Sequence, residues 1–534
     1  MKGKRLSIVG LLSCVCIAVV GVCRPAEIRA DALDLLETDI SSWRLEKARA
    51  RLEKLGEDAR SLPRAMFLKG ELLFYEGDAT AAVESLRRAV EGNRSEPLWK
   101  AVRDRAADTA RVFDTLERID GPSKRFVYRL DPALDGLLIP YAEETLLRQL
   151  EVLSRTFGDK PVRPIEVVFV SRSRDLAALS GLSREQIERT GTVGVTKYGR
   201  VMMLSPRSLV SGYPWLDTLA HELTHYVVTR ASLDRVPIWL HEGISKLLEC
   251  RWREASFQTL SPEEAYLLDR AVTDGRLIPL RRFHPSVAFL SDQEEAASAY
   301  AQTLSFTKYL SDRLPADWLK RLTRGLAAGT PLDHILRSMG DADLQRMYNW
   351  WRKSASGKHH TPPPAVGMMK KRFKQGAVAG TGSGDSLHAL EVRKHLRLGD
   401  LLRLRGHTVA AVQEFEKAEK LAQFTSPEIS DRLGAALIEV GDFRRAQVLL
   451  KKITALYPSH AGGFVQLARA CAGLTETAEA AAAFRAANAI NPFDPEIHCS
   501  AAELYRELGD SEAAARENRS CRAALQVQKK SEDG

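Results

Sequence analysis

The last third of the sequence repeats every 34 or 35 residues, and this period restricts the possible folds more than any other feature. Small residues mark the repeat at Gly399, Gly434, Ala468 and Ala502. In three of the four units a glycine follows seven positions later, at Gly406, Gly441 and Gly509. Large apolar residues recur in step, at Phe415, Leu450 and Phe484. Such a unit predicts two short amphipathic helices that cross closely at the small residues.

The period and the pattern resemble tetratricopeptide repeats (TPR). We predict C-terminal repeats over residues 387–525, and the same spacing at Gly70, Gly77 and Ala82 predicts N-terminal repeats over residues 33–120. Stacked helix pairs of this kind form a concave surface that takes peptides or other proteins. We therefore expect protein partners. A scaffold without a separable ligand is the alternative interpretation.

The region between the arrays, residues 124–355, has a different pattern. Residues 165–170 are a short apolar run typical of a buried strand, and residues 192–197 and 200–204 are the arms of a predicted hairpin. Helical patterns follow from residue 215. This order predicts an α+β domain. We expect the arm at residues 200–204 to be an edge strand able to pair with an extended peptide.

A flexible linker is predicted over residues 356–386. It contains three consecutive prolines at residues 362–364 and a glycine-rich run at residues 380–384. A segment of this composition cannot build an apolar core, so we expect it to tether the C-terminal repeats to the central region.

The first 30 residues are predicted to be a targeting segment. Residues 1–5 carry the positive charge of a signal peptide, and residues 6–23 are uncharged and mostly apolar. The alternative is an uncleaved membrane anchor, because 18 uncharged residues can nearly span a bilayer. We therefore expect an exported protein that is periplasmic, secreted or membrane-anchored in the cell envelope.

Charge and cysteines exclude some partners and sites. The net charge of +9 is spread along 534 residues without a compact basic patch, so we expect no nucleic-acid partner. Four cysteines lie beyond the targeting segment, and their spacing matches no zinc knuckle. Three of these fall in the repeats, where we expect small buried side chains: Cys471, Cys499 and Cys521.

The central region contains the motif H-E-x-x-H at residues 221–225. On a helix, residues four apart share one face, so His221 and His225 could bind a single Zn²⁺. Glu222 would lie beside them as a potential general base. The alternative is an ordinary amphipathic helix whose two histidines are hydrogen-bonded.

A third ligand decides between these interpretations. In the metzincin pattern it is a histidine six residues after the second, but Ala231 occupies that place and Val228 replaces the required glycine. Glu242 lies 17 residues after His225 and could reach the metal from the next helix. The adjacent His241 is the competing ligand.

The run H-E-L-T-H followed by P-I-W-L-H-E-G resembles the gluzincin metallopeptidases, particularly the peptidase MA-like domains that are often joined to TPR. The resemblance implies a zincin-like fold over residues 124–355 and one Zn²⁺ per chain on His221, His225 and Glu242. Glu222 would be the catalytic base and a peptide or protein the substrate. Tyr300 is a candidate oxyanion donor, with simple packing as its alternative role.

One position departs from the family. Some gluzincins carry an aspartate one turn after the ligand glutamate to orient a zinc-bound histidine, and here Lys246 stands there. Asp217, one turn before His221, is a candidate replacement. The sequence thus predicts a zinc-dependent endopeptidase flanked by TPR that recruit partners or substrates. The alternative is a catalytically inactive, peptidase-like TPR scaffold in the cell envelope.

Overall fold

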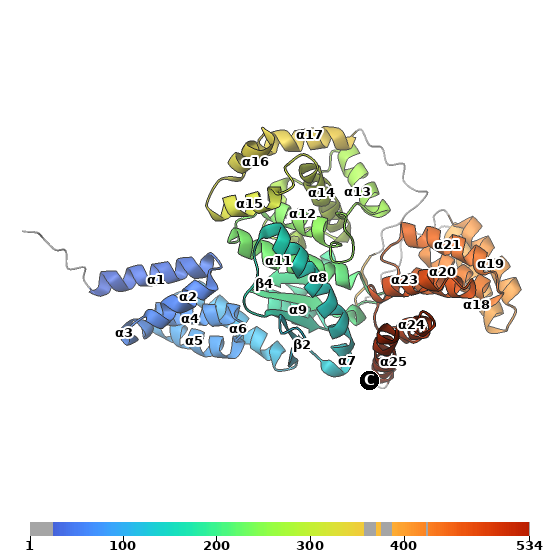
Figure 1. Ribbon diagram of the computed structural model, residues 1–534, viewed down its shortest axis with the longest axis horizontal. Helices are drawn as coiled ribbons and strands as arrows, with labels where there is room; N and C mark the ends of the chain where they lie inside the picture. The colour runs from blue at the N-terminus through green and yellow to red at the C-terminus, as the bar shows by residue number, and fades with distance from the viewer. Residues whose placement is uncertain (1–24, 357–369, 375–386, 423–425, 533–534) are drawn as a thin grey trace, which may run out of the picture.

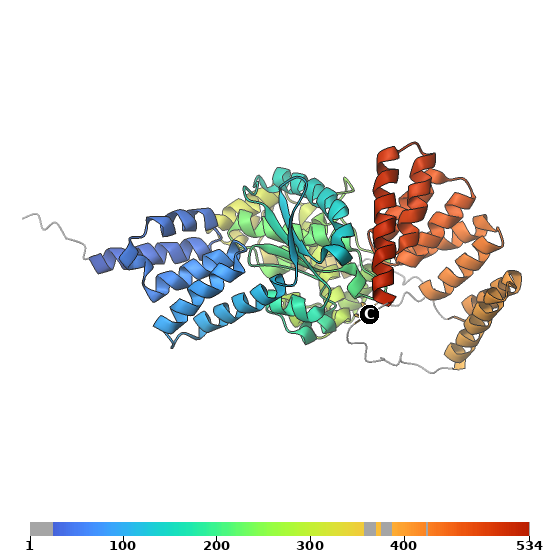
Figure 2. The ribbon, with the colours of Figure 1, turned by 90° about the horizontal axis from the view of Figure 1, so that it is seen from below.

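The computed structural model describes residues 25–356, 370–374, 387–422 and 426–532. A central domain containing a small mixed sheet lies between two arrays of helices, and Figures 1 and 2 show the arrays on opposite sides of it. The predicted targeting segment, residues 1–30, lies mostly outside the described residues. Within the described part, no helix combines the length and the apolar character needed to cross a membrane.

In the described residues the N-terminal array consists of six helices, of which α4 and α5 pack together most extensively. Gly70 lies where these two helices cross, and a Cβ there would come within 2.6 Å of Leu86. This close approach explains the small residue in the repeat pattern. Asp78 caps α5 by accepting a hydrogen bond from the Ala81 backbone N–H. The helices are α1 (Pro25–Ser41), α2 (Leu45–Lys54), α3 (Glu57–Arg60), α4 (Pro63–Tyr75), α5 (Ala79–Gly92) and α6 (Pro97–Phe113).

The central sheet has five strands in the order β1-β2-β3-β5-β4. Neighbouring strands among β2, β3 and β5 run parallel, whereas β1 and β4 run antiparallel to their neighbours. The first strand lies within the stretch predicted as repeats, so the sheet begins before residue 124. The strands are β1 (Glu117–Asp120), β2 (Phe126–Leu130), β3 (Ile165–Val170), β4 (Gly194–Lys197) and β5 (Arg200–Leu204).

The prediction that residues 200–204 form an edge strand is wrong. The predicted hairpin is present, but β5 lies between β3 and β4, and β4 is the edge. Every residue of β5 is buried, whereas the first three residues of β4 are half-buried and Lys197 is exposed. The continuous apolar run from Val201 to Leu204 suits a strand covered on both faces.

Helices cover the sheet and build the rest of the central domain. The helix α11 carries the H-E-x-x-H motif and packs against β4, β5, α8 and α12. The helices are α7 (Pro132–Asp135), α8 (Ile139–Phe157), α9 (Ser173–Ser180), α10 (Arg184–Thr190), α11 (Trp215–Ser232), α12 (Ile238–Leu248), α13 (Pro262–Thr273), α14 (Gln293–Ser311), α15 (Trp318–Ala327), α16 (Leu332–Gly340) and α17 (Leu344–Ser356). Short 3₁₀ turns lie at Gly136–Leu138, Pro206–Ser208, Leu280–Phe283 and Val287–Phe289.

The C-terminal array consists of helices that pack in consecutive pairs. At Gly434, a Cβ would lie 3.0 Å from Leu450 of the paired helix, so a small residue is required at this crossing as the repeat pattern predicts. The helices are α18 (Leu387–Leu404), α19 (Thr408–Leu421), α20 (Pro427–Glu439), α21 (Phe443–Leu456), α22 (Ala461–Gly473), α23 (Thr477–Asn488), α24 (Pro495–Glu507) and α25 (Ser511–Glu532).

The C-terminal array is attached to the central domain at the start of α11. The backbone N–H of Tyr213 donates to the carbonyl of Ile490 at 3.0 Å, and that of Trp215 donates to Ala489 at 3.0 Å. The Trp215 indole N–H adds a hydrogen bond to the carbonyl of Asn488 at 2.9 Å. The array therefore directly contacts the helix that carries the motif.

Part of the predicted flexible linker also contacts the central domain. Of residues 356–386, the structure describes residue 356 at the end of α17 and residues 370–374. Phe373 pairs with Leu209 as an antiparallel bridge, and the Val210 N–H donates to the carbonyl of Arg372 at 2.9 Å. The prediction of a free tether therefore does not hold at residues 370–374, because backbone groups of the segment find partners in the domain.

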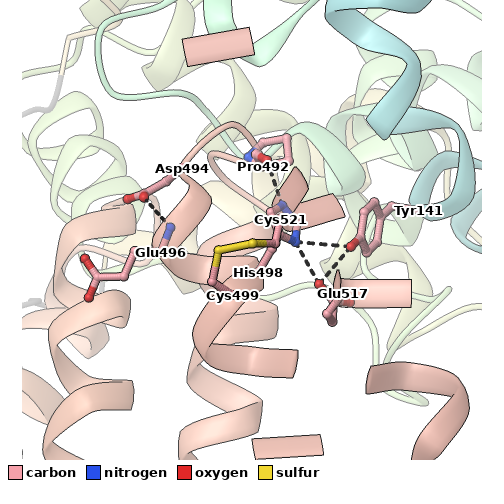
Figure 3. The surroundings of a disulfide bond; sticks show 8 residues. All are labelled: Tyr141, Pro492, Asp494, Glu496, His498, Cys499, Glu517 and Cys521. Atoms are coloured by element: carbon pink, nitrogen blue, oxygen red, sulfur yellow. Dashed lines mark hydrogen bonds and ion pairs between the residues drawn. A yellow bond between two sulfur atoms is a disulfide. The ribbon is translucent and has the colours of Figure 1, made fainter. Parts of the chain in front are cut away.

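A disulfide bond joins Cys499 of α24 to Cys521 of α25 (Figure 3). The prediction of small buried side chains is therefore wrong for these two cysteines, whereas Cys471 is buried with a free thiol. Cys250 is also free and buried. The spacing of 22 residues shows no known motif, and only the antiparallel packing of the two helices brings the sulfur atoms together.

Candidate metal centre

The helix α11 presents its histidines and glutamate beneath the edge strand of the sheet. It begins after Pro214 and ends at Ser232, and the next residue, Leu233, adopts a left-handed conformation with φ 54°. The apolar side chains of Leu219, Leu223 and Val227 are fully buried. The helix is therefore held by packing on one side, while His221, Glu222 and His225 point toward the site.

Three side chains converge on one point. The Nε2 atoms of His221 and His225 lie 3.0 Å apart, and Oε2 of Glu242 lies 3.4 Å from the first and 3.3 Å from the second. Tetrahedral zinc with bonds of about 2.0–2.1 Å places its ligand atoms about 3.3–3.4 Å apart. The triangle formed by these donors is close to that size. Among the described residues, this is the one group of three suitable side chains found so close together.

Glu242 carries a second sign of a cation site. Its Oε2 atom is buried and accepts no hydrogen bond from the described residues. A carboxylate oxygen left in that state is costly, and a bound cation removes the cost. Two imidazoles and one carboxylate, with no thiolate, form a donor set that suits catalytic zinc. The residues present therefore fit the metal that the sequence predicts.

The position of Glu242 depends on the glycine that follows it. Glu242 lies in the first turns of α12, which packs closely against α14. At Gly243, a Cβ would lie 2.9 Å from the carbonyl oxygen of Thr303 and would overlap the hydroxyl of Thr307. Glycine thus lets the two helices approach, and this approach sets where the Glu242 carboxylate lies.

The charges around the three side chains support this arrangement. Burial acts to raise the pKa of Glu242, but the neighbouring His225 and His221 hold it well below its ordinary value. Burial acts to lower the pKa of His221, but Glu242 and Glu249 raise it to about 9. The carboxylates of Glu242 and Glu249 therefore stabilise positive charge at this point, whether it is carried by a proton or by a metal ion.

The side chain of Glu222 extends from α11 toward the edge strand β4. The hydroxyl of Thr196 on β4 lies 2.7 Å from both the Oε2 atom and the backbone carbonyl oxygen of Glu222. Gly194 lies against the same side chain, since a Cβ there would come within 2.8 Å of Oε1. Burial raises the pKa of Glu222 against the lowering effect of the two histidines. A raised pKa suits a carboxylate that accepts and returns a proton.

A glutamate that the sequence reasoning missed orients His221. Oε2 of Glu249 lies 3.2 Å from Nδ1 of His221, and Nζ of Lys246 donates to Oε1 of Glu249 at 2.7 Å. Both Lys246 and Glu249 are shielded from solvent. The available signal was the spacing, because Glu249 follows Glu242 by seven residues, which is two turns along the same helical face.

Asp217 does not take this role, so that prediction is wrong. Its carboxylate instead accepts hydrogen bonds from the Trp252 indole at 2.9 Å and from the Arg253 guanidinium at 2.8 and 3.0 Å. One turn of helix separates Asp217 from His221 in the right direction. However, the loop after α12 offers Asp217 two strong donors, which draw its carboxylate away.

His241 lies behind His225 rather than in the triangle. The Nδ1 atoms of the two rings are 2.5 Å apart, and the other ring nitrogen of His241 lies 3.3 Å from the Thr229 hydroxyl. Burial, together with the nearby His225, lowers the pKa of His241 well below its ordinary value. A neutral His241 can therefore accept or donate a hydrogen bond at Nδ1 of His225.

Tyr300 of α14 lies beside the three side chains. Its ring meets the ring of His221 edge-on, with centroids 6.2 Å apart. Burial raises the pKa of Tyr300 well above its ordinary value, so the hydroxyl keeps its proton and can donate it in a hydrogen bond. The structure thus places Tyr300 at the site.

Family comparisons agree with two parts of this organisation. The family model described as the Peptidase MA superfamily matches residues 145–357, which contain all the side chains of the site. A tetratricopeptide repeat model matches residues 63–95 in the N-terminal array. No curated protein matches the chain.

Solved structures similar to the chain cover about a quarter of it. One is MamA from Desulfovibrio magneticus RS-1, with 22% identity and a TM-score of 0.24 over 26% of this chain and 77% of its own. Another is described as a thermophilic TPR protein in Thermus thermophilus. It has 24% identity and a TM-score of 0.24, and the match covers 26% of this chain and 75% of the other.

Proposed function

We propose that the Peptidase MA superfamily domain at residues 145–357 is a zinc-dependent endopeptidase of the gluzincin type with a zincin-like α+β fold. One observation carries the proposal: His221, His225 and Glu242 present three donor atoms 3.0–3.4 Å apart, with Glu222 beside them. A site that served stability alone would need a fourth protein ligand and no base. Three ligands and a neighbouring carboxylate favour catalysis.

Each residue of the site has a separate proposed role in peptide hydrolysis. One zinc ion held by His221, His225 and Glu242 would acidify a water molecule and polarise the substrate carbonyl. Glu222 would accept a proton from the attacking water and return it to the leaving amine. The Tyr300 hydroxyl, which stays protonated, is proposed to donate to the oxygen of the tetrahedral intermediate.

The edge strand supplies a place for the substrate backbone. Because β5 lies inside the sheet, we propose that an extended peptide adds to the open side of β4. The strand runs beside Glu222, through the contact of Thr196 with that residue. A peptide paired with β4 would therefore pass close to the base.

We further propose that the two repeat arrays recruit protein partners or substrates and that the protein is exported. The stacked helices and the repeat match at residues 63–95 support the first proposal. The disulfide between Cys499 and Cys521 supports the second, because such bonds persist in oxidising compartments.

The test replaces Glu222 by glutamine in protein purified without chelator. We expect the wild type to hold one zinc per chain and to cleave an unfolded protein substrate. Glu222→Gln should keep the zinc and lose at least a hundredfold in kcat, within the range of general-base catalysis of about 10²–10⁴-fold. Glu151→Gln, on the exposed face of α8, is the matched control and should leave both unchanged. Wild-type protein without zinc, or an active Glu222→Gln variant, would refute the proposal.

A further inference from the structure

The strands β4 and β5 form a hairpin, and the turn between them packs against the end of α4 in the N-terminal array. Tyr198 lies at this turn, and its ring lies 5.1 Å from the ring of Phe74 and stacks on Tyr75 with centroids 6.2 Å apart. The next residue, Gly199, has φ +74°, and a Cβ there would lie 2.6 Å from the carbonyl oxygen of Tyr75. Only glycine allows this approach, so the turn and the end of α4 fit each other closely.

The first residue of β5 secures the same junction. Arg200 is almost completely buried, and its guanidinium donates to the carbonyl of Phe74. It also lies over the Phe74 ring at 4.8 Å and forms an ion pair of 3.4 Å with Glu166 of β3. A buried guanidinium is stable only with such partners. The hairpin is therefore fixed on one side by the N-terminal array and on the other by the sheet.

The short strand β4 also contacts the site, close to the turn. Thr196 is two residues before Tyr198, and its hydroxyl is the group that lies 2.7 Å from Oε2 of Glu222. As the edge strand, β4 has β5 as its single strand neighbour in the described sheet. Its position therefore depends on its pairing with β5, on the turn, and on α11, to which Thr196 holds it.

We infer that the N-terminal repeat array helps to position the base of the proposed peptidase. Tyr198 anchors the hairpin in the array, and Thr196 passes this constraint to the Glu222 carboxylate. Both are positioning residues, since they act on the reaction through Glu222. The inference rests on the proposed function of Glu222 and adds to it a role for the repeats besides the recruitment of partners.

The test compares matched variants of the full-length protein on one peptide substrate. Thr196→Val removes the hydroxyl at nearly constant volume, and Thr196→Ser restores it. Tyr198→Ala removes the anchor, and Tyr198→Phe keeps the stacked ring. Trp99→Ala is the control, because Trp99 stacks on Phe67 at 5.0 Å inside the same array.

We expect Thr196→Val and Tyr198→Ala to lower kcat by about tenfold to a hundredfold, as for a hydrogen bond to a charged group. For Thr196→Val, KM should stay within about twofold, and the zinc content of neither variant should change. The serine and phenylalanine variants should recover most of kcat, and Trp99→Ala should keep it. In metal-free protein, the rate of backbone amide hydrogen exchange over residues 194–204 should rise for Tyr198→Ala but not for Trp99→Ala.

Other outcomes separate the two proposals. If the wild type binds zinc and cleaves peptide but Thr196→Val and Tyr198→Ala retain wild-type kcat, the positioning role is refuted and the peptidase stands. If either variant loses zinc, or if Thr196→Val binds substrate much more weakly, the effect is general and the positioning role is also refuted. If the wild type has neither zinc nor activity, the proposed function fails first, and the inference fails with it.

Discussion

Oε2 of Glu249 lies 3.2 Å from Nδ1 of His221, on the side of the ring away from Glu242. A proton on Nδ1 shared with this carboxylate leaves Nε2 free to bind a metal and fixes the plane of the ring. Lys246, which stands where some gluzincins carry an aspartate, donates to the other oxygen of Glu249 at 2.7 Å. Glu249, three residues after Lys246, thus provides the carboxylate that Lys246 lacks.

Glu249→Gln is expected to weaken zinc binding by about 10- to 100-fold, as is common when such a partner is removed. The amide keeps the size of the side chain but loses the charge that supports His221. Competition with a zinc-binding dye measures the affinity. Asp217→Asn is the control and should leave the affinity unchanged, because Asp217 pairs with Arg253 instead. Equal effects of the two variants would contradict the assigned roles.

Gly243→Ala is expected to destabilise the central domain by about 1–3 kcal/mol, the usual cost of overpacking. The added Cβ would overlap the Thr307 hydroxyl and push α12 from α14, which also displaces Glu242. Urea unfolding and zinc titration measure the two effects. Gly136→Ala is the control, since Gly136 has φ −58° and no heavy atom within 4 Å of the added Cβ. A Gly243→Ala variant as stable as the control would contradict the close helix contact.

Loss of the disulfide is expected to destabilise the C-terminal array by about 3 kcal/mol, the estimate for a loop of this length. The bond closes a loop between residues 22 apart, so it restricts the unfolded chain. Unfolding of the Cys499→Ser, Cys521→Ser double variant measures the loss. Cys471→Ser is the comparison for a buried free thiol. Peptide mapping that finds Cys499 and Cys521 unpaired in protein purified under oxidising conditions would refute the pairing.

A buried polar cluster, drawn in Figure 3, is expected to make the attachment of the C-terminal array depend on pH. Glu517 lies 2.7 Å from Nδ1 of His498 and accepts a hydrogen bond from the Tyr141 hydroxyl at 2.9 Å. Burial acts to raise the pKa of Glu517, but its contacts with His498 and Tyr141 hold it below the ordinary value. A carboxyl group with a depressed folded pKa stabilises the fold above its unfolded pKa of about 4.3.

This contribution should be lost as the pH falls through the folded pKa of Glu517. Urea unfolding between pH 6 and pH 3 should therefore show a steeper loss of stability for the wild type than for Glu517→Gln, whose amide does not titrate. Exposed Glu512→Gln should keep the wild-type slope. Equal slopes for the wild type and Glu517→Gln would show that the cluster does not link folding to pH.

Much of the site could be predicted because its side chains share one helical face or lie on consecutive helices. The spacing of His221 and His225 fixes their common direction wherever the helix packs, and Glu242 follows after one short loop. Glu249 was missed although its spacing was favourable, because a carboxylate near a histidine has many other available partners. Asp217 shows the same difficulty, since Arg253 and Trp252 determine its direction.

The sequence by itself determined the repeats and the ligand spacing, because both depend on periods of a single helix or helix pair. Tertiary structure decided which arm of the hairpin is the edge, which cysteines pair and which acid orients His221. Each of these depends on contacts between segments far apart in the chain. The link from Tyr198 to Glu222 also exists only because the N-terminal array, the sheet and α11 meet at one short strand.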